Sequence, residues 1–253
     1  MPNVNKALLH NLHGLGIQTG MMLLVHSSYK SLGRYAGGPE AIIDTLIEAV
    51  GKHGTIIMPA LSYDTVNDYS PYFDLRTTPS CVGVITETFR QHPNAARSLH
   101  PTHSAVAVGW DAEAVTEGHH LDDTPAGPNS PYRKLKEHKG KILFIGCGLR
   151  PNTSMHAVEE LVIPPYLFRP GHVAYTCKDK NGGVHTLNIK SHNFKYDDGS
   201  EVIQRYDRVS GLLHGDALLY GHLLAAECFL LDAKRLWDAA EAKLKDDPMF
   251  FVD

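Results

Sequence analysis

The stretch ILFIGCGLRPNTSMHAVEE, from Ile142 to Glu160, places an apolar run, two glycines and a segment of helical spacing in direct succession. The run that ends at Gly146 has the length and composition of a buried strand. The segment after Asn152 begins like a helix, and residues three apart on a helix share a face. His156 and Glu159 would therefore stand side by side near the start of that helix. The stretch predicts a strand–turn–helix unit of an α/β fold.

Strands and helices alternate through the first 160 residues. Short apolar runs predict buried strands at residues 21–28, 54–60, 104–109 and 141–146. Amphipathic spacing predicts helices at residues 4–14, 37–51 and 80–92, the last with Val82, Ile85 and Phe89 facing inward. This alternation favours one α/β domain over residues 1–253.

The C-terminal part is more mixed. Residues 172–178 and 184–190 have strand composition and flank DKNGG (179–183), whose Asn-Gly turn predicts a β-hairpin. Residues 232–244 predict a C-terminal helix that ends before Pro248. We find no repeat, low-complexity tract or linker, so this part is expected to elaborate the same domain.

Composition excludes several classes of protein. The 253 residues are 43% apolar, which is enough for one large core or two small ones. The net charge is −4 and no basic block is present, which argues against a nucleic-acid partner. No apolar run reaches the roughly 18 residues of a membrane span, and the N-terminus lacks the pattern of a signal peptide. The four cysteines form no CxxC pair, so a reducing cytoplasm is expected, and no resident metal.

The segment HSSYKSLGRYAGGPE (26–40) follows a strand and precedes a helix. Its hydroxyls at Ser27, Ser28 and Ser31, its glycines and the coming helix N-terminus suit a phosphate or pyrophosphate. It matches neither a Walker A loop nor GxGxxG. A plain strand-to-helix turn has the same composition, and composition alone favours that interpretation.

Two other loops carry polar groups. RSLHPTHS (97–104) precedes an apolar strand, and its His100 and His103 could ligate a metal, although no third ligand has a familiar spacing and HExxH is absent. LSYDTVNDYSPYFD (61–74) mixes carboxylates with aromatic side chains and could bind a polyamine or an amino sugar. On spacing alone, an ordinary loop is the better interpretation of the first, and a solvated loop is an equal alternative for the second.

His156 allows two interpretations. A histidine in the first turn of a helix lies at the positive end of the dipole, which favours the neutral imidazole. Such a ring can accept a proton, and Glu159 can fix its tautomer and stabilise the imidazolium. The alternative is that Asn152 or Thr153 caps the helix and His156 is a buried structural histidine, and spacing alone slightly favours this alternative.

Taken together and in this order, the segments at 26–40, 97–104 and 152–160 and the terminal DPMFF (247–251) resemble the aminoglycoside N(3)-acetyltransferase family. The resemblance runs from about Leu8 to Phe251. It implies the antibiotic N-acetyltransferase fold, which is distinct from the GNAT fold. That fold is an α/β domain with a central mixed sheet flanked by helices and an additional C-terminal β-hairpin region.

The resemblance also implies chemistry. The cofactor would be acetyl-CoA, His156 the general base and Glu159 its partner. The acceptor would be the 3-amino group of the 2-deoxystreptamine ring of an aminoglycoside, and the activity would confer resistance. The cofactor site would comprise His26, Ser27, Ser28, Ser31, Leu32, Gly33, Arg97, His100 and Ser104. The acceptor site would comprise Tyr63, Asp64, Asp74 and Thr153.

Three rival functions remain open. The chain is short and lacks long acidic insertions, so the same fold could act on another amine, amino sugar or hydroxyl. A metal-dependent hydrolase could use His100, His103, His156 and Glu159. A non-catalytic coenzyme A binder is the third. The sequence does not determine the oligomeric state, and a homodimer is compatible with it.

Overall fold

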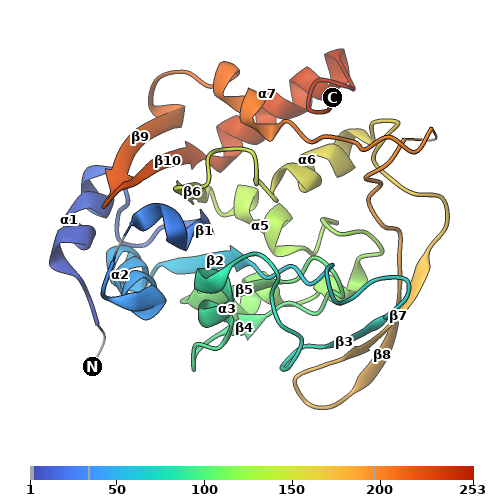
Figure 1. Ribbon diagram of the computed structural model, residues 1–253, viewed down its shortest axis with the longest axis horizontal. Helices are drawn as coiled ribbons and strands as arrows, with labels where there is room; N and C mark the ends of the chain where they lie inside the picture. The colour runs from blue at the N-terminus through green and yellow to red at the C-terminus, as the bar shows by residue number, and fades with distance from the viewer. Residues whose placement is uncertain (1–2, 34, 197) are drawn as a thin grey trace.

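The computed structural model describes residues 3–33, 35–196 and 198–253. Its central sheet consists, in spatial order, of β4 (Ala96–Arg97), β5 (Ala105–Gly109), β2 (Thr55–Pro59), β1 (Met22–Ser27), β6 (Lys141–Ile145), β10 (Ala226–Asp232) and β9 (Leu218–Leu223) (Figure 1). The middle strands β2, β1 and β6 are parallel. The outer strands are antiparallel to their neighbours. The sheet is therefore mixed, with a parallel centre.

The middle strands are continuous apolar runs because both of their faces are buried. Successive side chains of a strand point to opposite faces of the sheet. In β1, Leu23 and Val25 enter one core, whereas Met22 and Leu24 enter the other. Parallel strands that are covered on both sides show no polar alternation. The four strands expected from apolar runs are all present.

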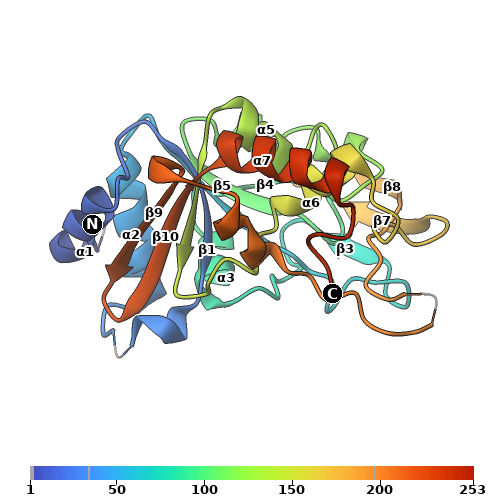
Figure 2. The same ribbon diagram turned by 90° about the horizontal axis from the view of Figure 1, so that it is seen from above.

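Helices cover both faces of the sheet, which Figure 2 shows nearly edge-on. One core is closed by α1 (Lys6–Gly14), α2 (Gly38–Val50) and α3 (Val84–Arg90). The other is closed by α4 (Ala112–Thr116), α5 (Pro131–Glu137), α6 (Met155–Val162) and α7 (Ala233–Asp246). Four 3-10 segments complete the described helical structure: η1 (Tyr29–Leu32), η2 (His119–Leu121), η3 (Tyr206–Gly211) and η4 (Gly215–Ala217). The predicted fold class, α/β with a mixed sheet between helices, is confirmed.

A second, smaller sheet lies beside the central one and contains β3 (Tyr72–Asp74), β7 (Val173–Lys178) and β8 (Val184–Ile189). The antiparallel pair β7 and β8 is the hairpin expected around the Asn-Gly turn. Strand β3 comes from the aromatic and acidic loop 61–74 and pairs in parallel with β7. Phe73 is fully buried there against Tyr175 and Leu187. Part of the 61–74 loop therefore belongs to the hydrophobic core of the smaller sheet.

Two expectations differ from the structure. The helix expected over 80–92 begins only at Val84, because Gly83 has a φ of +110° that no helix accepts. Val82 therefore precedes the helix and is half-buried. The hairpin β9–β10 is absent from the sequence-based expectations. Its turn contains Leu224 at a φ of +55°, a left-handed residue without the Asn-Gly signature that reveals such turns.

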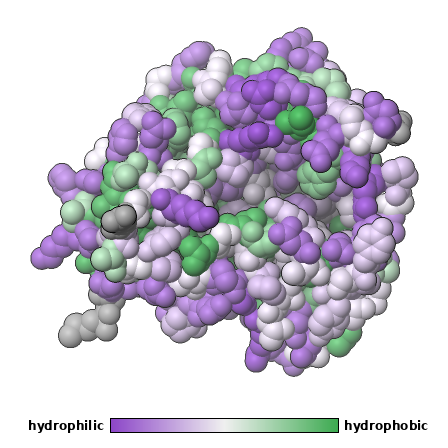
Figure 3. Space-filling model, viewed as in Figure 1, coloured by the Kyte–Doolittle hydropathy of each residue, from purple (hydrophilic) through white to green (hydrophobic). Residues whose placement is uncertain are grey.

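The helices of the described residues are short or amphipathic. None of them combines the length and the apolar character that crossing a bilayer requires. The face shown in Figure 3 is largely hydrophilic, and its apolar side chains form small, separate groups.

Arg97 of β4 ties the two sheets together. Its Nη1 donates to the carbonyls of Leu75 (3.2 Å) and Thr78 (2.6 Å), both of which follow β3. Its Nη2 donates to the carbonyl of Ala60, and its Nε donates to Ser104 Oγ at 3.0 Å. The guanidinium also lies 4.7 Å from the centre of the Phe73 ring. Burial lowers the pKa of Arg97 to about 9, so the charge is costly but retained near neutral pH.

Replacing Arg97 with lysine should destabilise the fold by about 2–4 kcal/mol, because one ammonium cannot serve carbonyls in three directions. The matched control is Arg169→Lys, since Arg169 forms an exposed pair with Asp68 at 2.9 Å. That change should cost about 1 kcal/mol or less. Urea unfolding of the two variants measures both values, and equal losses would contradict the role assigned to Arg97.

Candidate active site

A cavity of about 890 Å³ opens at the carboxyl ends of the parallel strands. Residues 25–27 at the end of β1, Pro59 at the end of β2, and Cys147 with residues 150–153 after β6 line it. Val82, just before α3, and Thr86, in its first turn, also line the cavity, and residues 201–204 close another side. Crevices of this kind at the carboxyl edge of α/β sheets are the usual ligand sites of such folds. The segment that begins with Ile142 therefore places the start of α6 at the edge of this cavity.

His156 lines this cavity from the first turn of α6 and is 6% exposed. Its Nδ1 lies 3.2 Å from Oε2 of Glu159, one turn further along the helix. This contact assigns the proton to Nδ1 and leaves the Nε2 lone pair available in the cavity. Ser154 occupies the N-cap position, and no side chain caps the helix. The alternative in which Asn152 or Thr153 caps the helix is therefore not what the structure contains.

Glu159 is fully buried, and two tyrosines satisfy its oxygens. Tyr166 donates to Oε1 at 2.8 Å, and Tyr206 donates to Oε2 at 2.7 Å. The Tyr206 hydroxyl also lies 3.1 Å from Nδ1 of His156. Burial and the adjacent carboxylate raise the pKa of both tyrosines, so both remain protonated donors. The carboxylate is thereby held in place beside the imidazole.

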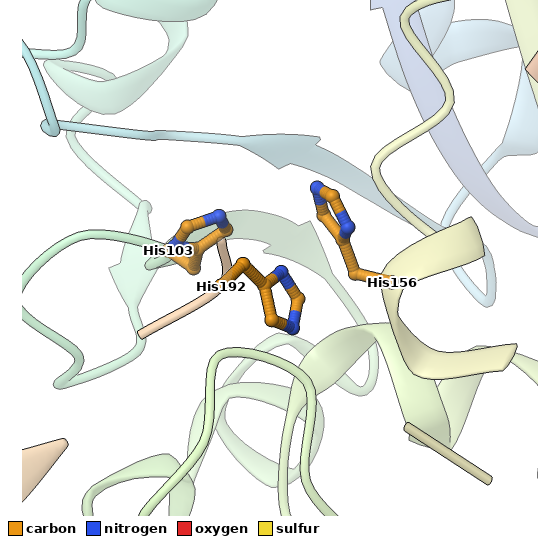
Figure 4. A group of neighbouring side chains, drawn as sticks. All are labelled: His103, His156 and His192. Atoms are coloured by element: carbon orange, nitrogen blue, oxygen red, sulfur yellow. The ribbon is translucent and has the colours of Figure 1, made fainter. Parts of the chain in front are cut away.

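Two further histidines stand against His156, as Figure 4 shows. The ring of His192 is centred 4.5 Å from that of His156, and the ring of His103 is centred 5.5 Å from it. His192 Nε2 lies 2.8 Å from Oε1 of Glu160. Burial lowers the pKa of His103 and of His192, and the neighbouring His156 lowers both further. Both rings are therefore neutral neighbours of the candidate base.

The residues expected to bind the cofactor divide into two groups. In the first, the serine loop, His26 and Ser27 line the cavity, whereas Ser28, Ser31, Leu32 and Gly33 lie outside its lining. Burial lowers the pKa of His26 to about 3, so this ring is neutral. Ser31 Oγ donates to the carbonyl of Gly146 at 2.6 Å and lies 2.9 Å from Ser28 Oγ, which fixes the loop to the end of β6. Leu32 is buried in the core, and Gly33 has a φ of +80° that ends the turn.

Arg97, His100 and Ser104 form the second group and do not line the cavity. Arg97 and Ser104 bond each other, and Ser104 Oγ donates to the carbonyl of Ala60 at 2.8 Å. His100 is fully buried, and its Nδ1 accepts from the backbone N–H of His103 at 3.0 Å. These side chains shape the wall behind His103, and their partners are already protein groups.

The expected acceptor residues are likewise divided. Tyr63 and Thr153 line the cavity. Asp64 is exposed and lies outside the lining. Asp74 is buried in β3, accepts from the backbone N–H of Arg76 at 2.9 Å and pairs with Lys178 at 3.2 Å. Its carboxylate is therefore occupied by the smaller sheet, away from the cavity.

A family model described as aminoglycoside 3-N-acetyltransferase matches residues 24–245. Aminoglycoside N(3)-acetyltransferase III of Salmonella sp is 32% identical over 262 residues, which cover 92% of this chain and 88% of that protein. The chain belongs to the aminoglycoside 3-N-acetyltransferase family. The family predicted from the sequence is thereby confirmed, and with it membership of an acyltransferase family.

This chain also matches two other relatives, but over a smaller share of their length. The SPbeta prophage-derived aminoglycoside N(3')-acetyltransferase-like protein YokD of Bacillus subtilis (strain 168) is 32% identical over 178 residues, 62% of this chain. The chain spans 65% of YokD and 59% of aminoglycoside N(3)-acetyltransferase IV of Salmonella sp in these matches.

Solved structures of aminoglycoside acetyltransferases share the fold of this chain. An alanine variant of AAC(3)-IVa in complex with a gentamicin has a TM-score of 0.81 at 28% identity, covering 97% of this chain and 89% of that one. The binary complex of AAC-IIIb with CoASH has a TM-score of 0.79 at 27% identity, covering 96% of this chain and 97% of that one. AAC-IIIb, a structural neighbour of this chain, therefore binds coenzyme A, the carrier of the expected acetyl group.

Several side chains of this site were not predicted from the sequence. Tyr206 lies 50 residues beyond His156, and no spacing rule connects the two. The pair of His192 and Glu160 is also distant in sequence. Asn152 stands within the quoted stretch, and its buried Nδ2 has no partner among the described residues while its Oδ1 accepts from Ser154. The sequence indicated Asn152 only as a candidate helix cap, whereas the structure places it in the cavity lining.

Removing the Tyr206 hydroxyl should leave Glu159 one donor short in a buried position. Tyr206→Phe should therefore lower the free energy of unfolding by about 1–3 kcal/mol, measured by urea denaturation. The control is Tyr220→Phe, because the Tyr220 hydroxyl donates to Glu227 at 3.1 Å at an exposed site where water can replace it. That control should leave unfolding nearly unchanged. Wild-type stability in Tyr206→Phe would show that Glu159 does not depend on this donor.

Proposed function

We propose that this chain is an acetyl-CoA-dependent N-acetyltransferase that acts on the 3-amino group of the 2-deoxystreptamine ring of aminoglycosides, and so confers resistance. The observation that carries the proposal is the His156–Glu159 pair, with Nδ1 held by the carboxylate at 3.2 Å and the opposite nitrogen in the cavity. Family membership supports the acyl transfer, and the gentamicin complex of the neighbouring structure supports the acceptor class.

His156 would act as the general base. Its Nε2 takes a proton from the acceptor amine, and Glu159 stabilises the resulting imidazolium through Nδ1–H. The cofactor, when bound, would supply the thioester whose carbonyl carbon forms the new C–N bond while its C–S bond breaks. His156 then returns its proton to the departing thiolate, so the ring ends neutral. No acyl-enzyme is needed, and burial raises the pKa of Cys147, the cysteine that lines the cavity, to about 11, which disfavours a thiolate nucleophile.

The negative charge that develops on the carbonyl oxygen needs donors. The Ser104 hydroxyl already donates to the carbonyl of Ala60 and is fully buried. Thr153 lines the cavity beside His156, and Asn152 Nδ2 is a buried donor in the same wall. We assign the oxyanion contact to Thr153 and Asn152, since both precede the base by a few residues and move with it.

A second candidate acceptor is an amine with fewer positive charges. Glu201 is the one acidic residue among the described residues that line the cavity, and the lining also contains the positively charged Arg150. Aminoglycosides carry several ammonium groups, which carboxylates would normally hold. The lining therefore also favours a monoamine or a lightly charged amino sugar, accepted by the same base.

A panel of acceptors separates these two candidates. Purified protein is incubated with acetyl-CoA and with gentamicin-, neomycin- and kanamycin-type drugs, a simple amino sugar or a primary monoamine, while thiol release is followed. Turnover with the drugs, together with resistance of cells that express the protein, supports the first candidate. Turnover with the amino sugar or monoamine alone supports the second, and no turnover with any amine contradicts the proposed function.

Replacing the base should separate catalysis from cofactor binding. His156→Ala should lower kcat about 10²- to 10⁴-fold, the usual contribution of a general base, with little change in acetyl-CoA affinity measured by calorimetry. His185→Ala is the control, because His185 also pairs with a carboxylate, Asp179 at 2.8 Å, but lies on the β7–β8 hairpin. Wild-type turnover in His156→Ala would remove His156 from the mechanism.

Four further predictions belong to this proposal. The described cysteines are all free, which fits a reducing cytoplasm. A single domain over residues 1–253 and a homodimer both remain predictions. A nucleic-acid partner is not expected from a net charge of −4.

A further inference from the structure

Three imidazoles converge beside the cavity, and two of them, His103 and His156, line it (Figure 4). One ring nitrogen from each of His103, His156 and His192 lies within 4.8 Å of the other two, and all three side chains are buried. The ring centres are 4.5, 5.5 and 5.7 Å apart. Three imidazoles around a tetrahedral zinc ion, with Zn–N bonds of about 2.0–2.1 Å, place their ligating nitrogens roughly 3–3.5 Å apart, so small rotations of these rings would reach that geometry. The cluster therefore has nearly the dimensions of a three-histidine metal site.

The hydrogen bonds leave lone pairs on the inner side of this cluster. Glu160 binds His192 through Nε2 at 2.8 Å, so the proton lies there and Nδ1 keeps its lone pair. Glu159 does the same for His156 through Nδ1, which leaves Nε2. Histidines that ligate metals commonly have a carboxylate on the remote nitrogen, because it fixes the tautomer and raises the basicity of the ligand. Two of the three rings have this arrangement.

A buried ring nitrogen of His192 is a second, independent indication of a ligand. Nδ1 of His192 is fully buried and has no hydrogen-bond partner among the described residues. Glu160, in contrast, is firmly anchored, since it also accepts from Thr124 Oγ1 at 2.6 Å and from the backbone N–H of Ala126 at 2.9 Å. A buried acceptor without a donor costs free energy, whereas a bound cation would use it.

We propose that His103, His156 and His192 form a binding site for a divalent transition-metal ion of the Zn²⁺ class, with its fourth position open to the cavity. His103 and His156 line that cavity, which gives the ion a path and a place for a water ligand. Nδ1 of His103 faces Thr102 Oγ1 at 2.9 Å, a neutral partner that suits a ligating imidazole.

The ion is an exchangeable inhibitor rather than a resident cofactor. Bound zinc occupies the nitrogen with which His156 would accept a proton, so it competes with the acceptor amine. This consequence rests on the proposed function, whereas metal binding itself does not. Zinc should therefore raise the apparent KM for the amine and leave the KM for acetyl-CoA unchanged.

Cobalt provides a direct measurement of the site, because tetrahedral Co²⁺ absorbs visible light far more strongly than the aqueous ion. The metal-stripped full chain is titrated with Co²⁺ alone, and Zn²⁺ binding is measured by calorimetry. Wild-type protein should bind one ion per chain with a tetrahedral spectrum. His192→Gln should weaken binding about tenfold or more. The matched control His185→Gln, which removes a carboxylate-paired histidine outside the cluster, should leave affinity unchanged.

The outcomes are separable. Absence of saturable binding in the wild-type protein, or equal affinity in wild type and folded His192→Gln, overturns the site. If His192→Gln does not fold, X-ray absorption of the wild-type zinc complex decides instead: three imidazole ligands support the site, and fewer overturn it. Binding without competition against the amine overturns only the inhibitory role. If the chain transfers no acetyl group at all, the proposed function fails while the titration still decides the site.

Discussion

The buried carboxylate of Glu159 is the constraint on which the arrangement of the site depends. A charge without access to water is tolerated only when its oxygens are hydrogen-bonded. Tyr166, Tyr206 and His156 meet that requirement from the loop after α6, from η3 and from α6 itself. Satisfying one side chain therefore draws distant parts of the chain to the same cavity wall. Folding and the orientation of the base are consequences of the same contacts.

Arg97 plays the corresponding part where the two sheets meet. Its donors end on carbonyls of Ala60, Leu75 and Thr78 and on Ser104, so it binds the smaller sheet to the larger one. Ser104 directly follows His103, whose backbone N–H is held by His100. The polar residues of the 97–104 segment thus position one cavity histidine. Their presence together reflects support of the wall as much as contact with a ligand.

Local rules predict only part of this molecule. The strands at 21–28 and 141–146, the Asn-Gly hairpin and the pairing of His156 with Glu159 all follow from spacings of a few residues. Tyr206 and His192 could not be predicted, since they reach the site only through tertiary folding. Asp74 stays a prediction as an acceptor residue, but it lies outside the cavity lining. Nothing local in the sequence reveals that β3 pairs with β7 or that Lys178 pairs with the Asp74 carboxylate. The hairpin β9–β10 escapes prediction because its turn uses Leu224 in a left-handed conformation.

The chemistry of the cavity depends more on the lone pairs of its imidazole nitrogens than on charged side chains. His103 and His192 are kept neutral by burial, and the acidic partners Glu159 and Glu160 stand behind the rings instead of in the cavity. An amine at His103 and His156 therefore meets nitrogen acceptors, and the one carboxylate among the described lining residues is that of Glu201. Such a wall can align the N–H bonds of an amine and remove one proton without binding the ammonium form too tightly to react. The same nitrogen lone pairs should also bind a metal ion, because Zn²⁺, like a proton, binds to the lone pair of an imidazole nitrogen.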